Sequence, residues 1–388
     1  MGDFATLLIH WQRRHGRHGL PWQGADAYCV WLSEIMLQQT QVATVIPYYR
    51  RFVTSFPDLP ALAAASEDEV LAHWSGLGYY SRARNLHRAA QLIMQQHGGA
   101  FPRNFDEILA LPGIGRSTAA AISALVFHER RAILDGNVKR VLARYCSVEG
   151  YTGEKKIETQ LWQQAETLLP MRDIATYTQG LMDLGATVCT RSKPRCALCP
   201  LREECAANQS GRVAQLPAPR PRKMLPEKHS TFLLLLSGSD ILLEKRPGSG
   251  IWGGLWCPPQ FENEAAALVW CAQRGIESVR TDASTGSAQG KHGVSKGHGL
   301  KPRSGSTPHT HRVREPLRGH ERGKYSCGTP PPFTHTFTHF KLHIAPLLLQ
   351  VTHKPRQMQE PGRVWLDMRD ALRAAIPSPV RKLIEKVI

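Results

Sequence analysis

The sequence lacks the features of a membrane or secreted protein. No apolar run approaches the roughly 18 residues of a membrane-spanning helix, and the longest lies near residues 232–236. The N-terminus has Asp3 and a basic, His-rich continuation in place of the apolar stretch of a secretory signal. The nine cysteines are an odd number, and four of them lie between positions 189 and 205, which does not fit a disulfide framework. We therefore expect an intracellular protein without a membrane partner.

Acidic residues are scarce relative to basic ones. The 388 residues include 49 Lys and Arg against 32 Asp and Glu, which gives a formal net charge of +17 and a pI near 9.7. A surplus of this size favours a polyanionic partner, with nucleic acid ahead of an acidic membrane surface. The length and a hydrophobic content of 42% allow two or three folded domains.

The spacing of apolar residues changes along the chain. Residues 1–208 have apolar side chains at three- and four-residue intervals, as over 138–145, and predict a helical domain. Residues 209–228 contain four prolines and several basic residues, and predict an extended linker.

Residues 229–388 predict a second domain that mixes strands and helices. The expected elements are strands over 230–236 and 241–245, a helix over 262–274, an alternating strand over 335–344, and a last helix with Ser378 as its cap and Pro379 at its first position. Residues 281–332 hold nine Gly, nine Lys and Arg and three acids, and predict a disordered insert.

The segment Leu111–Arg116 (LPGIGR) lies between two predicted helices, over 105–110 and 117–127. Gly113 and Gly115 allow a tight reversal with positive φ, and the turn presents backbone N–H groups and a helix N-terminus to an anion. A DNA phosphate fits such a site without any reading of the base sequence. An ordinary glycine turn between packed helices is the alternative, but the net charge favours a DNA-binding helix-hairpin-helix over 105–127.

Four cysteines follow the pattern C-x6-C-x2-C-x5-C, namely Cys189, Cys196, Cys199 and Cys205. Four thiolates within seventeen residues suit one metal centre, either zinc or a [4Fe–4S] cluster. Zinc sites more often use two C-x2-C pairs, and one such pair is present here, so the spacing favours the iron–sulfur cluster.

These two motifs together resemble the endonuclease III superfamily of DNA glycosylases, and within it the MutY branch, the adenine DNA glycosylases. The similarity extends over segments 31–42 (WLSEIMLQQTQV), 76–82 (GLGYYSR), 134–140 (LDGNVKR), 252–256 (WGGLW) and 335–340 (HTFTHF). The resemblance implies a mostly α glycosylase domain with an iron–sulfur cluster loop, followed by an α+β Nudix-like domain. It also implies removal of adenine mispaired with 8-oxoguanine or guanine in double-stranded DNA. We expect a monomer located with the DNA in the cytoplasm or nucleoid of a bacterium.

Excision of a base requires a pocket for the flipped nucleotide, an acid for the departing base and a negative group for the cationic sugar. Glu34 lies mid-helix on a face with Val30 and Leu37, where burial raises a carboxyl pKa; the resemblance implies that it protonates adenine N7. Asp135 precedes a helix that starts near Gly136, and a helix N-terminus favours the ionised form. The resemblance implies that it stabilises or captures an oxocarbenium ion. For Glu34 the alternative is a structural role as a buried carboxyl with a polar partner. For Asp135 the alternative is an ordinary helix cap.

Other residues are placed at the DNA by the resemblance. Bifunctional members of the superfamily carry a Schiff-base Lys where this chain has Ser117, so the chain is expected to be a monofunctional glycosylase that leaves an abasic site. Gln39 and Tyr79 are implied to wedge into the base stack beside 8-oxoguanine, with Thr40 near them, although core packing is the alternative for Tyr79. Segment 20–22 resembles the loop that approaches the adenine pocket.

The second domain resembles a Nudix fold, in which a Glu-rich helix binds magnesium. The helix over 262–274 lacks that acidic cluster, so we expect recognition of 8-oxoguanine rather than hydrolysis. The recognition loop is expected at Phe337, Thr338 and His339, with Thr where the family usually has Ser. Two other classes stay open: a non-catalytic DNA-binding protein with an iron–sulfur or zinc site, and a Nudix-type nucleotide hydrolase, which the missing acidic helix disfavours.

Overall fold

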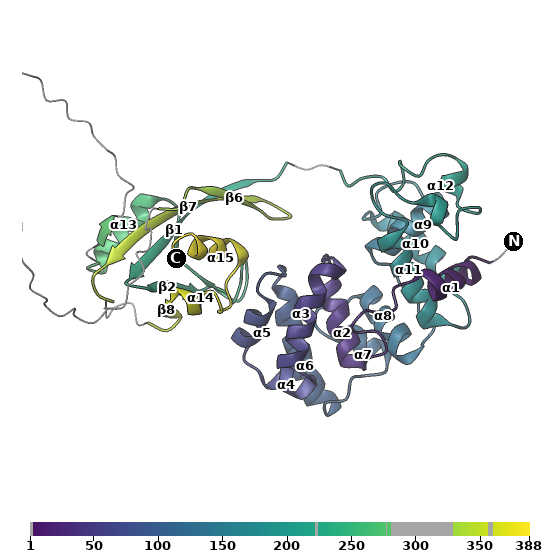
Figure 1. Cartoon of the computed structure of the whole chain (residues 1–388), viewed down its shortest axis with the longest axis horizontal. Helices are drawn as coiled ribbons and strands as arrows, with labels where there is room; N and C mark the ends of the chain where they lie inside the picture. Colours follow the sequence, from purple (N-terminus) through teal and green to yellow (C-terminus); the bar gives the residue numbers. More distant parts are fainter. Residues whose placement is uncertain (1–2, 222–223, 277, 281–328, 356–359) are drawn as a thin grey trace, which may run out of the picture.

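The computed structural model describes residues 3–221, 224–276, 278–280, 329–355 and 360–388. A helical domain is followed by a domain built around one β-sheet, as the sequence predicted (Figure 1). The expected insert at 281–332 lies outside the described residues, apart from 329–332. Within the described ranges, no helix combines the length and the apolar character that crossing a membrane requires.

The helical domain forms two packed lobes. Its helices are α1 (Phe4–His15), α2 (Ala27–Leu37), α3 (Val42–Ser55), α4 (Leu59–Ala64), α5 (Glu67–Trp74), α6 (Ser81–His97), α7 (Phe105–Ala110), α8 (Arg116–Phe127), α9 (Gly136–Tyr145), α10 (Lys155–Thr167), α11 (Ile174–Thr187) and α12 (Ala206–Gln209), with a 3-10 turn η1 (Cys196–Leu198). One core lies among α2 to α8 and includes Trp31 and Trp74, and the other lies among α1 and α8 to α11 and includes Leu8 and Tyr177. Helix α8 contributes to both cores, so the hairpin motif joins the two lobes.

Within its described residues, the second domain is an eight-stranded sheet with helices on both faces. Its elements are β1 (Glu227–Ser237), β2 (Asp240–Lys245), β3 (Trp256–Cys257), β4 (Gln260–Phe261), β5 (Ser278–Arg280), β6 (Phe333–Thr336), β7 (Lys341–Val351), β8 (Arg363–Asp367), α13 (Glu264–Gln273), α14 (Met368–Ala371) and α15 (Ser378–Glu385). The central order is β3-β2-β1-β7-β5, with β4, β6 and β8 paired to β1, β7 and β2. Strands β1 and β7 run parallel.

The apolar run Phe232–Leu236 is the centre of this sheet. Every residue of the run is buried, because Leu233 and Leu235 pack with α13 while the even-numbered positions pack with α14 and α15. A strand covered on both faces needs no polar alternation, which explains the continuous apolar stretch.

Two sequence predictions in this domain are wrong in detail. Residues 335–344 do not form one strand, because the chain turns between β6 and β7 and Phe337 N donates to Phe340 O at 2.9 Å. The alternation is correct beyond the turn, where Phe340, Leu342 and Ile344 are buried. The last helix has Pro377 rather than Ser378 as its N-cap, so the expected side-chain cap is absent at that described position.

Candidate active site

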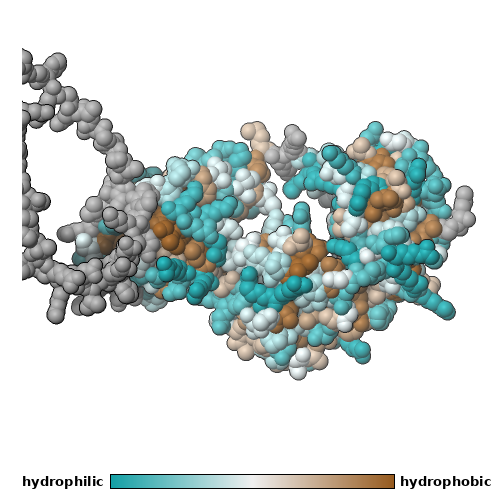
Figure 2. Space-filling model, viewed as in Figure 1, coloured by the Kyte–Doolittle hydropathy of each residue, from teal (hydrophilic) through white to brown (hydrophobic). Residues whose placement is uncertain are grey.

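A cleft of about 930 Å³ opens between the two lobes of the helical domain. It is lined by the end of α2, the start of α8, the start of α9 and the end of α11. The side of the molecule that Figure 2 presents has an open hollow between the helical domain and the sheet domain. The cleft brings together several residues that the sequence singled out: Glu34, Gln39, Thr40, Gly115, Ser117 and Asp135.

Glu34 projects from α2, a helix whose neighbouring positions Ser33 and Ile35 are buried. Burial raises the pKa of the Glu34 carboxyl to about 7, and the negative charge of Asp135 acts in the same direction. No hydrogen bond from the described residues contributes to the stability of its ionised form. The side chain is therefore poised between its acid and its anion near neutral pH.

Asp135 is the N-cap of α9, as the sequence predicted. Its carboxylate accepts a hydrogen bond from Val138 N at 2.8 Å and another from the Asn137 amide at 3.4 Å. Burial raises the pKa of Asp135, and this effect exceeds the lowering by these hydrogen bonds and by the charge of Arg140. Burial therefore raises the pKa of both carboxyls, although the helix N-terminus at Asp135 favours the ionised form.

The hairpin motif fixes the approach to Asp135. The Ser117 hydroxyl accepts a hydrogen bond from Leu134 N at 2.9 Å and so ties the start of α8 to the residue before Asp135. Gly113 has φ of +81°, and a Cβ there would lie 2.8 Å from Asn85 Cβ. Gly115 has φ of −98° and serves as the N-cap of α8, so one of the two glycines adopts the expected left-handed conformation.

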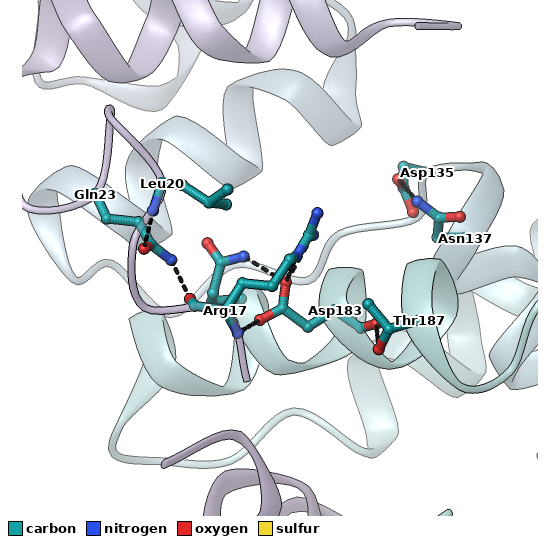
Figure 3. Close-up of polar contacts among 8 residues, drawn as sticks. Arg17, Leu20, Gln23, Asp135, Asn137, Asp183 and Thr187 are labelled. Carbon is teal, nitrogen blue, oxygen red and sulfur yellow. Dashed lines mark hydrogen bonds and ion pairs between the residues drawn. The ribbon is translucent and has the colours of Figure 1, made fainter. Parts of the chain in front are cut away.

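A buried ion pair beside the cleft escaped the sequence analysis. Asp183 on α11 is fully buried and accepts hydrogen bonds from Arg17 N at 2.9 Å, Arg17 Nε at 2.7 Å and Gln179 Nε2 at 2.9 Å. Gln23 Nε2 in turn donates to Arg17 O at 2.6 Å (Figure 3). This network holds the loop between α1 and α2, in which Trp22 packs edge-on against Tyr49. Arg17 itself lines the cleft.

A second arginine, Arg82, forms hydrogen bonds with the turn after α2. Arg82 is buried, and its guanidinium donates to carbonyls at the end of α2 and to Gln38 O at 2.6 Å. Gln39 and Tyr79 flank this network with φ of +60° and +48°, a left-handed conformation that is uncommon for non-glycine residues. Tyr79 is 44% exposed, so it is not a core residue.

The remaining predicted DNA contacts lie elsewhere. Tyr79 lines a second cleft, of about 580 Å³, together with Phe337, Thr338 and His339 from the turn between β6 and β7. This second cleft lies between the helical domain and the sheet domain, because its walls come from both. Apart from Gly113 and the four cysteines, the predicted site residues thus divide between a cleft within the helical domain and a second cleft shared by the two domains.

The four cysteines line one pocket, although they are spread over seventeen residues of sequence. Arg144 is 3% exposed and donates to Cys189 Sγ at 3.3 Å, which places a cation against the sulfur atoms. In the part of the chain that the structure describes, no three His, Cys, Asp or Glu side chains are close enough to hold a single metal ion. Four cysteine sulfurs that line one pocket are a donor set that fits an iron–sulfur cluster as well as zinc.

Comparison with known proteins agrees with this geometry. Residues 32–167 match the HhH-GPD superfamily of base excision DNA repair proteins, and residues 231–298 match the NUDIX domain. Over 384 residues the chain is 35% identical to the adenine DNA glycosylase of Buchnera aphidicola subsp. Acyrthosiphon pisum. The aligned region covers 98% of this chain and 97% of that protein. The chain belongs to the adenine DNA glycosylase family.

More distant relatives extend the same similarity. The adenine DNA glycosylase of Mus musculus is 30% identical over 441 residues, covering 98% of this chain and 77% of that protein. A thermostable thymine-DNA glycosylase of known structure is 30% identical, with a TM-score of 0.49, and covers 53% of this chain and 95% of its own. This member of the family is a DNA repair enzyme with DNA as its partner, and the resemblance stated from the sequence is confirmed. The alternatives of a non-catalytic DNA-binding protein and a nucleotide hydrolase are set aside.

Proposed function

We propose that this glycosylase removes adenine from duplex DNA in which adenine is mispaired with 8-oxoguanine or guanine, and that it acts as a monomer. The observation that supports the proposal is the meeting of Glu34 and Asp135, which are 101 residues apart in sequence, in one cleft of about 930 Å³. Ligand pockets of several hundred Å³ commonly enclose molecules of nucleoside size. A base that has left the stack can therefore sit between an acid and an anion.

In this mechanism Glu34 donates its proton to N7 of adenine. With its pKa raised to about 7, roughly half of the carboxyls hold a proton at neutral pH, which suits a general acid. The C1′–N9 bond then breaks with its electron pair on the base, and the sugar becomes an oxocarbenium ion. Asp135, held by Val138 N and Asn137, supplies the negative charge that stabilises this cation until water adds at C1′.

The enzyme is expected to stop at the abasic site. A lyase step needs an amine that forms an imine with the sugar, and Ser117 stands where the bifunctional enzymes of the superfamily carry Lys. The Ser117 hydroxyl already accepts the hydrogen bond from Leu134 N, which suits a structural role beside Asp135.

The base opposite adenine is proposed to be read in the second cleft. Tyr79 would stack beside 8-oxoguanine with Gln39 and Thr40 near the opened pair, while Thr338 and its neighbours Phe337 and His339 would contact the oxidised base. Helix α13 lacks the acidic cluster of a Nudix hydrolase. We accordingly assign residues 1–208 to catalysis, 209–228 to the linker and 229–388 to recognition.

We also propose that Cys189, Cys196, Cys199 and Cys205 hold a [4Fe–4S] cluster. When bound, such a cluster supplies a covalent cross-link that fixes the fold of its loop. Arg191 of this loop lines the catalytic cleft, and Arg140 on α9 donates to Cys189 O at 2.7 Å. The chain's own part is to present these basic side chains to DNA phosphates in a fixed arrangement.

The test is excision under single-turnover conditions from duplexes that pair adenine with 8-oxoguanine, guanine or thymine. We expect activity on the first two alone, and a loss of at least about 100-fold in Glu34→Gln and Asp135→Asn. Strand breaks should require alkali, and borohydride should not trap the enzyme on DNA efficiently. Near-normal excision by both folded variants would contradict the catalytic assignment, and efficient trapping would contradict the monofunctional one.

A further inference from the structure

The loop between β2 and β3 contacts the helical domain in a way that the proposed mechanism does not use. Arg84 on α6 donates a hydrogen bond to the carbonyl of Gly253. Gly254 has φ of +77°, and a Cβ there would lie 2.9 Å from Glu67 Oε1. The backbone of this loop therefore lies directly on α5 and α6, at the edge of the helical domain that faces the sheet domain (Figure 1).

The same loop supports the turn proposed to contact 8-oxoguanine. Trp252 is buried, and its ring centre lies 5.4 Å from that of Phe337 and 5.9 Å from that of His335. Phe337 in turn stacks on Phe340 at 4.4 Å. Since Trp252 directly precedes Gly253, a shift of the carbonyl that Arg84 binds also shifts the ring on which Phe337 rests.

Arg84 also lies near Tyr79, on the wall of the second cleft that the helical domain provides. Its backbone N–H donates to Tyr80 O at 3.2 Å, in the first turn of α6, and Tyr79 is the residue just before. Arg84, Tyr79 and Thr338 all line this cleft. A short path of contacts thus joins the two walls, from Tyr79 through Arg84 and Trp252 to the turn at Phe337.

We propose that Arg84 is a positioning residue that sets how strongly the enzyme prefers 8-oxoguanine over guanine opposite adenine. This inference rests on the proposed function, because it concerns the same second cleft. The hydrogen bond from Arg84 fixes the separation between Tyr79 and Thr338 so that an 8-oxoguanine nucleotide contacts both. Without the bond, the turn at Phe337 moves relative to Tyr79, and the contacts that distinguish the oxidised base weaken.

Other contacts keep the domains together when this bond is removed. Lys245 forms an ion pair with Asp68 at 2.8 Å, and Ser75 Oγ donates to Ile376 O at 2.8 Å. The substitution Arg84→Met keeps the aliphatic stem that lies beside Gly254 and removes the donor. It is expected to loosen one loop without separating the domains.

The experiment measures single-turnover excision from two duplexes of one sequence, with 8-oxoguanine or guanine opposite adenine. The full chain is compared with Arg84→Met and with Arg88→Met, which removes the same charge from an exposed position one turn further along α6. Arg84→Met is expected to lose about ten-fold of the rate on the 8-oxoguanine duplex, the effect of one charge-assisted hydrogen bond. Its rate on the guanine duplex should stay within about two-fold, and Arg88→Met should preserve both rates.

The guanine duplex also reports whether Arg84→Met is folded and chemically competent. A preference unchanged in Arg84→Met, or an equal fall on both duplexes, overturns the inference and leaves the proposed function in place. A wild-type enzyme with equal rates on the two duplexes overturns the proposed 8-oxoguanine specificity, and the inference with it.

Discussion

The substitution Glu34→Gln separates stability from activity, because it removes a titrating group and preserves the shape of the side chain. Burial and Asp135 raise the pKa of Glu34 from 4.5 to about 7 in the folded protein. One pKa unit corresponds to about 1.4 kcal/mol, so the ionised carboxyl costs the folded state about 3 kcal/mol.

The sign of the effect follows from proton binding. Between pH 4.5 and about pH 7 the folded state holds more protons on Glu34 than the unfolded state does. The stability that depends on a protonated Glu34 is therefore fully present below this pH range and is lost as the pH rises through it. Glutamine does not titrate. We expect Glu34→Gln to match the wild type near the acid end of the window. At about pH 8 it should be more stable by about 3 kcal/mol, while excision is lost.

The assay is denaturant unfolding followed by far-UV circular dichroism at about pH 5 and about pH 8, beside single-turnover excision. Glu385→Gln, at the exposed end of α15, is the matched control and should show no stability gain that depends on pH. Equal stability of wild type and Glu34→Gln at both pH values would refute the argument that the cleft desolvates this carboxyl. Wild-type excision should also fall as pH rises above about 7, about ten-fold per unit, because the acid form is consumed.

Three further substitutions test the surrounding structure. Asp183→Asn leaves Arg17 without its buried counterion, so it should lower the free energy of unfolding by about 3 kcal/mol, measured in urea, and slow excision by loosening the loop before α2. Ser117→Ala removes one hydrogen bond and should cost about 1 kcal/mol, with a smaller loss of excision rate than Asp135→Asn in the same assay. Cys199→Ser should lower the iron content and the melting temperature of the purified protein, measured by absorbance and thermal unfolding, whereas zinc binding predicts no brown colour at all.

Local features of the fold could be predicted because their causes are local. Asp135 caps α9 through a bond to Val138, three residues on, and such a cap is visible in sequence. The run Phe232–Leu236 is a strand buried on both faces, which its unbroken apolar character indicates. In both cases the deciding contact is either short-range or required by the residue type.

Contacts between distant residues left no comparable signal. Arg17 and Asp183 are 166 positions apart, and Arg84 and Gly253 are 169 apart, so neither pair could be proposed from one sequence. The strand predicted over 335–344 failed for another reason. The four-residue turn reverses the alternation, because Phe333 pairs with Ile344 and His335 with Leu342, and the apolar pattern from which the strand was predicted lies only beyond the turn.

The pKa of Asp135 depends on its burial in the cleft as well as on its position at a helix N-terminus. A helix N-terminus favours the anion, and the hydrogen bonds from Val138 and Asn137 act in that direction. Burial in the same cleft opposes them and prevails, because the cleft removes water from both carboxyls. The negative charge of Asp135 adds to burial in raising the pKa of Glu34 to about 7, so about half of the Glu34 carboxyls hold a proton at neutral pH. The hydrogen bonds from Val138 and Asn137 hold Asp135 in place, which is consistent with the proposed division into Glu34 as the acid and Asp135 as the anion.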